Sequence, residues 1–255
     1  MNFKIGDVCQ IAIEAGKKIL EIYRDESIDW EVDKKSDNSP LTIADKLANE
    51  IICKGLNLLS SQIPIISEEN KQVPYLERKD WKLFWLVDPL DGTKEFLKKN
   101  GEFTVNIALV EKNVPIWGVV YVPVTDELFY ASQGNGAWIK SKEGVKPLNG
   151  NKIKDPKSTV RVVCSRSHMN EETKQFLAQF HDCKLISKGS SLKFMLVAEG
   201  KADIYPRLGP TMEWDTGAAH AIILEAGGSV LDINANSELS YNKESLLNGY
   251  FEVTC

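Results

Sequence analysis

Apolar residues recur every three or four positions near the start of the chain. Ile5, Ala12 and Ile19 share this spacing with several residues between them, which predicts an amphipathic helix that packs one face on a core. A second helix is expected from about Thr42 to Leu59. The first part of the chain therefore begins with two helices.

Short apolar runs then predict strands. The runs 63–67 and 82–87 each stop at an acid, Glu68 and Asp88, so we expect two strands that carry carboxylates at their ends. The range 103–124 is rich in β-branched and aromatic residues and contains Asn-Val-Pro, which we interpret as a turn. Together with 127–132 it predicts an antiparallel meander.

The pattern changes near residues 151–158. From Val160 onward apolar strands alternate with helical segments, which is typical of an α/β layer. We expect strands at 161–165, 183–187, 202–206, 229–233 and 249–255, and helices at 171–180, 191–200 and 214–228. The sequence thus predicts an α+β lobe over 1–155 with a mostly antiparallel sheet, and an α/β lobe over 156–255 with a mixed sheet.

Composition excludes several classes of protein. A hydrophobic content of 43% and a charged content of 26% over 255 residues are ordinary for a globular protein. The net charge of −5 disfavours binding to a nucleic acid polymer. Charges interrupt the N-terminal region, and no long apolar run follows, so we expect neither a signal peptide nor a transmembrane segment. Five scattered cysteines without a C-x-x-C pair predict reduced thiols in a cytosolic protein.

Four acids suggest a metal site. Glu68, Asp88 and Asp91 lie at or just after strand ends, and Asp215 opens a predicted helix. Converging carboxylates cannot all stay ionised without a counter-charge. Oxygen ligands without nearby His or Cys favour Mg²⁺ over zinc, and the carbonyl of Leu90 offers a further oxygen.

The stretch from Asp88 to Thr93 combines this metal site with a phosphate cradle. Pro89 stiffens the turn, so that Asp88 and Asp91 can face one point. Gly92 and Thr93 begin a predicted helix, whose free N–H groups and dipole attract phosphate. A metal beside a phosphate cradle indicates phosphate-ester chemistry.

Each feature also has an ordinary structural explanation. Asp-Pro and Asp-Gly pairs form turns, Asp215 can cap a helix, and Asp45 follows Thr42 at capping-box spacing. Glu68 can belong to a solvated loop. Their joint occurrence directly after buried strands favours the metal site.

Three motifs, SEE (67–69), DPLDGT (88–93) and EWDTGAA (213–219), resemble those of the inositol monophosphatase superfamily of Mg²⁺-dependent, lithium-sensitive phosphatases. Further segments, GSSLKF (189–194), YPRLGPT (205–211) and Lys94 in place of a second Thr, are similar to its CysQ-type 3′(2′),5′-bisphosphate nucleotidase branch. The resemblance implies alternating α-β-α-β-α layers. It also implies hydrolysis of the 3′-phosphate of adenosine 3′,5′-bisphosphate (PAP) to AMP, with the sulfated nucleotide PAPS as a second substrate, in sulfur metabolism.

The resemblance also assigns roles. Two or three Mg²⁺ ions per active site would be bound by Glu68, Asp88, the Leu90 carbonyl, Asp91 and Asp215. Thr93, backed by Asp45, would orient a metal-activated water for in-line attack, with Glu68 also counted as catalytic. The expected substrate contacts are Gly92, Thr93, Ser165, Arg166, His168, Gly189, Lys193, Arg207 and Asp215. Among these, Arg166 and Arg207 are our own additions, as cations available to the second phosphate.

Other functions remain open at this point. An inositol monophosphatase of relaxed specificity is the nearest alternative. A haloacid-dehalogenase type enzyme would use D-x-D, whereas this chain has D-x-x-D. A metal-dependent anion sensor without catalysis is a third. We expect a small phosphorylated nucleotide as the partner, a monomer or homodimer, and a cytoplasmic protein, either free or peripheral on the cytoplasmic face of the inner membrane.

Overall fold

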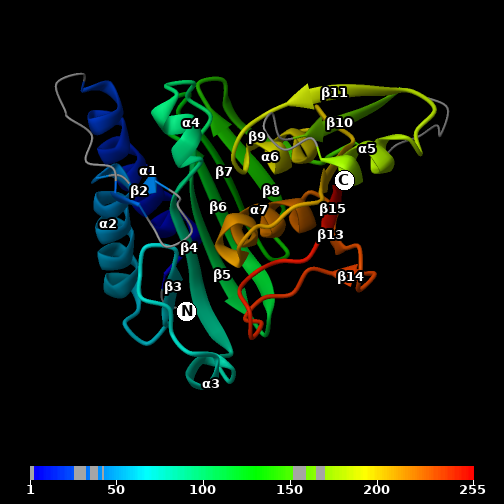
Figure 1. The fold of residues 1–255 in the computed structure, drawn as a ribbon. Helices are drawn as coiled ribbons and strands as arrows, with labels where there is room; N and C mark the ends of the chain where they lie inside the picture. The colour runs from blue at the N-terminus through cyan, green and yellow to red at the C-terminus, as the bar shows by residue number, and fades with distance from the viewer. Residues whose placement is uncertain (1–2, 26–32, 35–39, 42, 152–158, 165–169) are drawn as a thin grey trace.

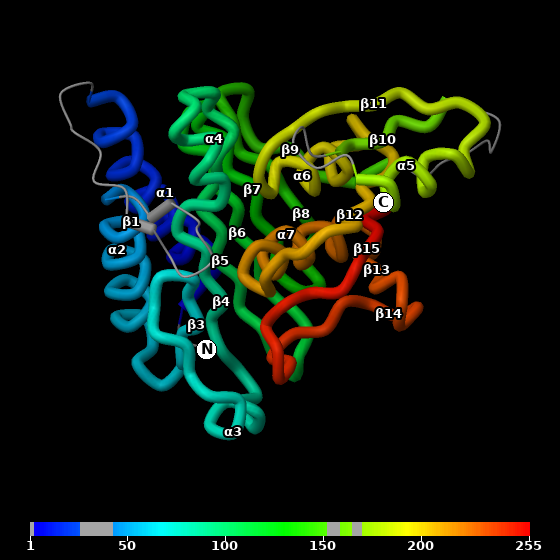
Figure 2. The backbone as a smooth tube through the Cα atoms, in the orientation of Figure 1, coloured from blue at the N-terminus to red at the C-terminus, as the bar shows by residue number. Residues whose placement is uncertain are grey.

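The structure, a computed structural model, describes residues 3–25, 33–34, 40–41, 43–151, 159–164 and 170–255. Within these residues two large β-sheets alternate with helices (Figures 1 and 2). The predicted lobe boundary at 155/156 lies outside the described residues. A minor pair of strands, β1 (Asp33–Lys34) and β2 (Pro40–Leu41), stands apart from both large sheets.

The first sheet has seven strands within the described residues, in the order β3-β4-β5-β6-β7-β8-β9. Only β3 and β4 pair in parallel, so the prediction of a mostly antiparallel sheet is confirmed. The sequence did not predict β8 and β9, because they are short and β9 is mostly exposed. The bounds are β3 Ile65–Ser67, β4 Leu83–Asp91, β5 Thr104–Glu111, β6 Val114–Val122, β7 Glu127–Ser132, β8 Ala137–Ser141 and β9 Gly144–Leu148.

The turn between β5 and β6 lies one residue earlier than predicted. Lys112 and Asn113 form a two-residue loop with φ of +49° and +68°, and Val114 and Pro115 already belong to β6. A two-residue hairpin loop of this kind needs positive φ at both positions, which Asn tolerates well. The Asn-Val-Pro assignment was therefore wrong in its position, whereas the meander itself is confirmed.

Both faces of the first sheet are buried, as the alternation along β4 makes clear. Trp85 and Val87 belong to the core formed with α1 (Ile5–Arg24) and α2 (Ile43–Leu59). Phe84 and Leu86 belong to a second core on the opposite face. Successive side chains of a strand point to opposite faces, so this apolar run predicted a buried strand correctly. Both predicted helices are confirmed, although Thr42 lies outside the described residues.

The second sheet is mixed, as predicted. Its order is β11-β10-β12-β15-β13-β14, with β10 parallel to β11 and β12 and the other pairs antiparallel. The bounds are β10 Val160–Cys164, β11 Cys183–Ser187, β12 Ile204–Arg207, β13 Ser229–Asp232, β14 Ser237–Glu238 and β15 Phe251–Thr254.

Helices complete the layers. Val163 of β10 faces the core shared with α6 (Leu192–Ala198) and α7 (Glu213–Glu225). Its neighbour Val162 faces a smaller cluster that includes Phe176 of α5 (Glu171–Leu177). The order α1/α2, first sheet, α6/α7, second sheet, α5 confirms the α-β-α-β-α sandwich (Figure 1). The short helices α3 (Tyr75–Arg78) and α4 (Thr93–Leu97) flank β4.

Helix α7 lies unusually close to the first sheet. A Cβ atom at Gly118 of β6 would stand 2.1 Å from the carbonyl oxygen of Ala218 in α7. Only glycine permits this approach of backbone to backbone. Within the described residues, no helix has the length and apolar character needed to cross a membrane.

Candidate active site

A bulge in β4 brings Asp88 and Asp91 to one face of the sheet. The prediction that the strand ends at Asp88 was wrong, because β4 continues through DPLD to Asp91. Asp88 lies opposite Asn106 and Asp91 lies opposite Thr104, so one extra residue is accommodated in β4. In a regular strand, side chains three positions apart point to opposite faces of the sheet. The extra residue of the bulge turns Asp91 to the same face as Asp88. Both acids therefore face the α6/α7 side.

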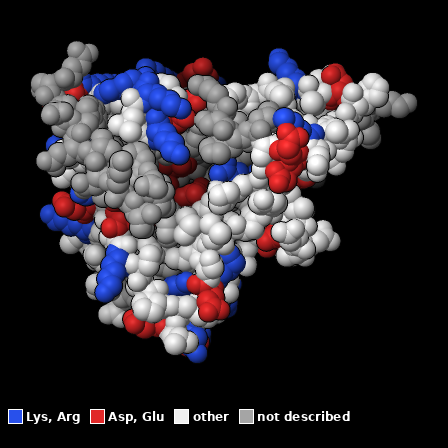
Figure 3. Space-filling view, in the orientation of Figure 1, with Lys and Arg blue, Asp and Glu red and all other residues white. Residues whose placement is uncertain are grey.

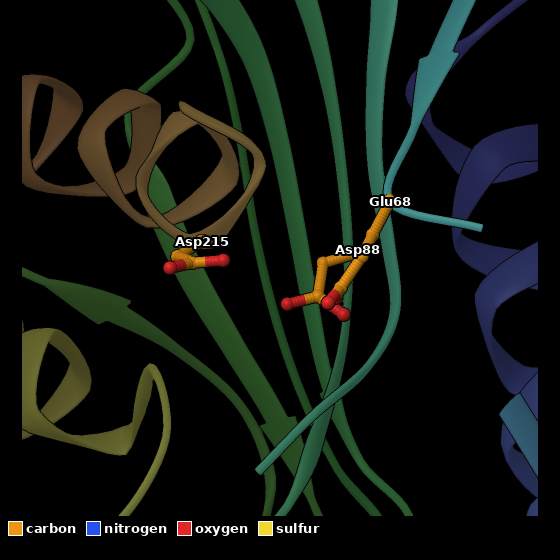
Figure 4. A group of neighbouring side chains, drawn as sticks. All are labelled: Glu68, Asp88 and Asp215. Atoms are coloured by element: carbon orange, nitrogen blue, oxygen red, sulfur yellow. The ribbon is translucent and has the colours of Figure 1, made fainter. Parts of the chain in front are cut away.

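Glu68 reaches the same place from the neighbouring strand. It follows β3 directly, and its N–H donates to the carbonyl of Val87 at 3.1 Å. Since β3 and β4 run in parallel, the residues that follow them emerge at the same edge. Figure 4 shows Glu68 and Asp88 side by side, with their carboxylates directed toward one another.

Asp215 faces these two acids from the first turn of α7 (Figure 4). Its Oδ2 accepts a hydrogen bond from the N–H of Met212 at 2.9 Å. Asp215 therefore caps the helix from its third position, whereas the N-cap residue itself is Met212. Carboxylate oxygens of Glu68, Asp88 and Asp215 all lie within 4.8 Å of one another. The structure thus brings together three of the four predicted acidic metal ligands.

Burial and mutual repulsion make these acids hard to ionise. Asp88 is 1% exposed, and burial, then the charges of Glu68, Asp91 and Asp215, raise its pKa well above the ordinary value. The pKa of Asp215 is raised to about 8 by burial and by Asp91 and Glu68. A divalent cation would relieve this repulsion, and a donor set made only of carboxylate and carbonyl oxygens fits a hard ion such as Mg²⁺.

Asp91 stands next to this group and is directed toward α6. Its Oδ2 accepts hydrogen bonds from the Ser190 hydroxyl at 2.7 Å, the Ser191 N–H at 2.7 Å and the Ser191 hydroxyl at 2.9 Å. Its charge still raises the pKa of both Asp88 and Asp215. The sequence predicted Asp91 as a metal ligand, which stays a prediction, and did not predict its serine partners.

The residues after Asp91 form the predicted helix start. Gly92 has φ +95°, and a Cβ there would lie 3.0 Å from the carbonyl oxygen of Glu102. Thr93 opens α4, and its hydroxyl donates to the carbonyl of Leu90 at 3.4 Å. Asp45 lies buried in the first turn of α2, near enough to raise the pKa of Asp88. The expected hydrogen bond between Thr93 and Asp45 stays a prediction.

Two cations approach the acids from the second sheet side. Lys193 of α6 is 7% exposed, and burial lowers its pKa to about 8 although Asp91 opposes this shift. Its ammonium donates to the carbonyl of Ser190 at 2.6 Å. Arg207 ends β12 and donates to the Pro210 carbonyl at 2.7 Å, while its buried Nε has no hydrogen-bond partner within the described residues. Such an orphaned donor is suited to an anionic ligand.

The surface agrees with this arrangement. Figure 3 shows acidic side chains deep in a hollow between the α4 side and the second sheet side, with basic ones beside them. Gly189, also predicted as a substrate contact, donates its N–H to Glu102 Oε2 at 2.8 Å. Ser165, Arg166 and His168 lie outside the described residues.

Sequence reasoning missed four polar residues that surround Asp91, namely Thr104, Asn106, Ser190 and Ser191. All but Ser190 are nearly or fully buried. Two signals could have revealed them. Asn106 is a lone amide in the apolar run TVNIALV, and the two serines lie in GSSLKF, from which only Gly189 and Lys193 were selected.

Known proteins are similar to this chain in both sequence and fold. The profile of the inositol monophosphatase family matches residues 5–251. A 3′(2′),5′-bisphosphate nucleotidase CysQ of Salmonella typhimurium is 47% identical, covering 98% of this chain and 99% of the relative. The corresponding protein of Buchnera aphidicola is 48% identical, over 97% and 92%. The crystal structure of CysQ from Bacteroides thetaiotaomicron superposes with a TM-score of 0.87 at 45% identity, covering 100% and 98% of the two chains. The chain therefore belongs to the inositol monophosphatase family.

Proposed function

We propose that this protein is a Mg²⁺-dependent 3′(2′),5′-bisphosphate nucleotidase that removes the 3′-phosphate of PAP to give AMP and phosphate. PAPS is proposed as a second substrate. The observation that carries the proposal is the group of three carboxylates, Glu68, Asp88 and Asp215, within 4.8 Å of one another. The names of near full-length relatives at 46–48% identity support the choice of substrate.

The metal is proposed to be Mg²⁺, with two or three ions per site. Glu68, Asp88, Asp91, Asp215 and the Leu90 carbonyl would hold them, because these groups offer only hard oxygen ligands. Bound ions would supply an activated water and neutralise charge on the transferred phosphate. The raised pKa of Asp88 and Asp215 supports the need for such a counter-charge.

Thr93 is proposed to orient the attacking water. Its hydroxyl lies at the start of α4, directly after the acids of β4. A hydroxyl is too weak a base to act alone, so it would donate its hydrogen bond to Asp45 in place of the Leu90 carbonyl and keep a lone pair directed at the water. The N–H groups of Gly92 and Thr93 would then hold the phosphate oxygens.

The second phosphate is proposed to bind the cations across the site. Lys193 and Arg207 are available there, and the unpartnered Nε of Arg207 supports an anion at this position. Gly189, Ser165, Arg166 and His168 are proposed as further contacts to the nucleotide. A substrate with two separated phosphates fits a site of this kind. One phosphate would bind beside the metal held by the acids, and the other would bind the cations.

A phosphate-release assay tests this function. PAP, PAPS, 3′-AMP and inositol 1-phosphate would be compared with and without Mg²⁺, using the wild type and Arg207→Gln. We expect Mg²⁺-dependent turnover with PAP preferred, and a higher KM of the variant for PAP but not for 3′-AMP, which lacks the second phosphate. A preference for inositol 1-phosphate would instead favour an inositol monophosphatase of relaxed specificity. Metal-independent turnover would contradict the proposed site.

The cellular setting is proposed from the same reasoning. We propose a cytoplasmic enzyme, either free or peripheral on the inner membrane face, that acts as a monomer or homodimer and is built from lobes 1–155 and 156–255. Membrane fractionation and light scattering of the purified protein would test location and assembly.

A further inference from the structure

Asp91 uses its two oxygens unequally. All the hydrogen bonds that this carboxylate accepts within the described residues go to Oδ2. Three of them, from Ser190 and Ser191, are 2.7 to 2.9 Å long, and the fourth, from the Asn106 amide, is 3.5 Å. Oδ1 is therefore the oxygen left to approach a metal.

Behind Asp91 a buried polar ring continues. The amide of Asn106 donates to the Ser191 hydroxyl at 2.9 Å, and the Thr104 hydroxyl donates to Asn106 Oδ1 at 3.0 Å. Thr104 Oγ1 also lies 2.7 Å from the hydroxyl oxygen of Ser190. Thr104, Asn106 and Ser191 are each at most 1% exposed. Water is thus excluded, and such a network specifies one arrangement of its members.

The direction of the Ser191 proton follows from this ring. Because Asn106 donates to the Ser191 hydroxyl, that hydroxyl is free to donate its own proton onward. It has two acceptors, Asp91 Oδ2 at 2.9 Å and the Asp215 backbone carbonyl at 3.2 Å. A bond to a carboxylate is the stronger one. Asn106 therefore orients Ser191, and Ser191 holds Asp91.

The ring also joins the two halves of the site. Asp91, Thr104 and Asn106 belong to the first sheet, whereas Ser190 and Ser191 immediately precede α6. Ser191 stands between Asp91 of β4 and the backbone of Asp215 in α7. The Ser191 hydroxyl is thus one of the groups that hold Asp91 beside the backbone of Asp215.

We propose that Ser191 and Asn106 are positioning residues for the metal site, which keep Oδ2 of Asp91 turned toward α6 and Oδ1 toward the metal. The proposal rests on the proposed Mg²⁺ site. Groups that hydrogen-bond to metal ligands commonly set metal affinity, and their loss costs roughly 10–100-fold. A ring that merely supports the fold would leave Mg²⁺ affinity unchanged.

Isothermal titration calorimetry with Mg²⁺ tests the proposal. Ser191→Ala, Asn106→Ala and the double variant would be compared with wild type. We expect each single variant to bind Mg²⁺ roughly 10–100-fold more weakly. The double variant should bind Mg²⁺ no more weakly than the worse of the two single variants, because Asn106 acts mainly through the hydrogen bond from Ser191 to Asp91, its own contact with Asp91 being 3.5 Å long.

Further measurements separate positioning from folding. Thr104→Val keeps nearly the same side-chain volume and removes the donor that orients Asn106, so it should weaken Mg²⁺ binding in the same direction. The control is Ser229→Ala, which removes a hydroxyl contact to Thr254 on the second sheet and should leave Mg²⁺ affinity unchanged. In assays the Ser191→Ala enzyme should need more Mg²⁺ for half-activation and regain most of its kcat at saturating Mg²⁺.

The outcomes are distinguishable. A wild type that does not bind Mg²⁺ would contradict the proposed function itself. If the wild type binds Mg²⁺ and Ser191→Ala binds it equally well, the positioning role is refuted. Additive losses of affinity in the double variant would refute the relay from Asn106 through Ser191. A lower Tm in Ser191→Ala without any change in Mg²⁺ affinity would leave only a structural role, and would also refute the proposal.

Discussion

Replacing Asp88 by Asn should make the metal-free protein more stable while removing its response to Mg²⁺. Asp88 is the most deeply buried of the three clustered acids. Its Oδ1 accepts the N–H of Leu90 at 3.1 Å, and the Asn oxygen can keep this bond. The new amide group can donate to the carboxylates of Glu68 or Asp215. The substitution therefore removes charge with little loss of hydrogen bonding.

The expected magnitude follows from the spacing of the acids. At 4.8 Å, the upper limit of the distances between these oxygens, two full charges repel by about 3.5 kcal/mol at an effective dielectric constant of about 20. Three such pairs would cost about 10 kcal/mol, comparable with the whole stability of about 5–15 kcal/mol of an ordinary domain. The metal-free protein must therefore retain protons on this cluster. Those protons already relieve part of the repulsion. We therefore expect Asp88→Asn to raise the free energy of unfolding of the metal-free protein by about 1–3 kcal/mol, and each kcal/mol should raise its Tm by about 2–4 °C.

The pH dependence has a definite sign. The folded-state pKa of Asp215 is about 8, against an ordinary value of 3.8, and that of Asp88 is also raised. The folded protein therefore binds more protons than the unfolded chain between about pH 4 and pH 8, and the stability of the metal-free wild type falls as the pH rises through that window. The advantage of Asp88→Asn should accordingly grow from pH 6 to pH 8.

Thermal unfolding in EDTA and in excess Mg²⁺ measures both effects. In Mg²⁺ the wild type gains stability by binding, so its Tm should approach or exceed that of the variant. Asp80→Asn removes an exposed acid and serves as the control for net charge. If Asp88→Asn unfolds at a lower Tm than the wild type in EDTA at pH 8, the argument from repulsion is wrong.

Three further predictions concern the water, helix α7 and a buried histidine. Thr93→Ala should lower kcat by about 10²–10⁴-fold with little change in Mg²⁺ affinity, and Thr93→Ser should retain much of the activity; equal kcat values for the two variants would show that the hydroxyl is not needed. Gly118→Ala should lower the free energy of unfolding by about 1–3 kcal/mol and weaken Mg²⁺ binding, since its Cβ would stand 2.1 Å from the Ala218 carbonyl and push α7 away. Gly6→Ala, which meets open space in α1, is its control in the same denaturation and Mg²⁺ titrations, and should not be destabilising. Burial lowers the pKa of His220, so the unfolded chain binds the proton first, and stability in saturating Mg²⁺ should fall as the pH drops below about 6.5. His220→Gln should show a shallower fall in denaturant titrations between pH 7 and pH 5.5, and an unchanged slope would refute this assignment.

The sequence by itself determined most of the element types and most of the acids that gather at the site. The continuous apolar run that precedes Asp88 has the composition of a strand buried on both faces, and three-residue and four-residue spacing marked α1. These signals are local, so they are readable without a fold. The acids Glu68 and Asp215 were found for the same reason, because each follows or opens a recognisable element.

Tertiary structure decided how these residues meet. A bulge is defined by the pairing of β4 with β5, so the sequence of DPLD alone reads equally well as a turn. The close approach of α7 to the first sheet depends on Gly118. This residue is distant in the sequence from α7, and glycine is needed there because the backbone of β6 lies against the backbone of α7. Likewise, Asn106 and Ser191 are 85 residues apart, and their roles exist only once the residues that precede α6 lie against β5. Local composition specifies each element, whereas the chemistry of the site depends on contacts between elements that no local pattern encodes.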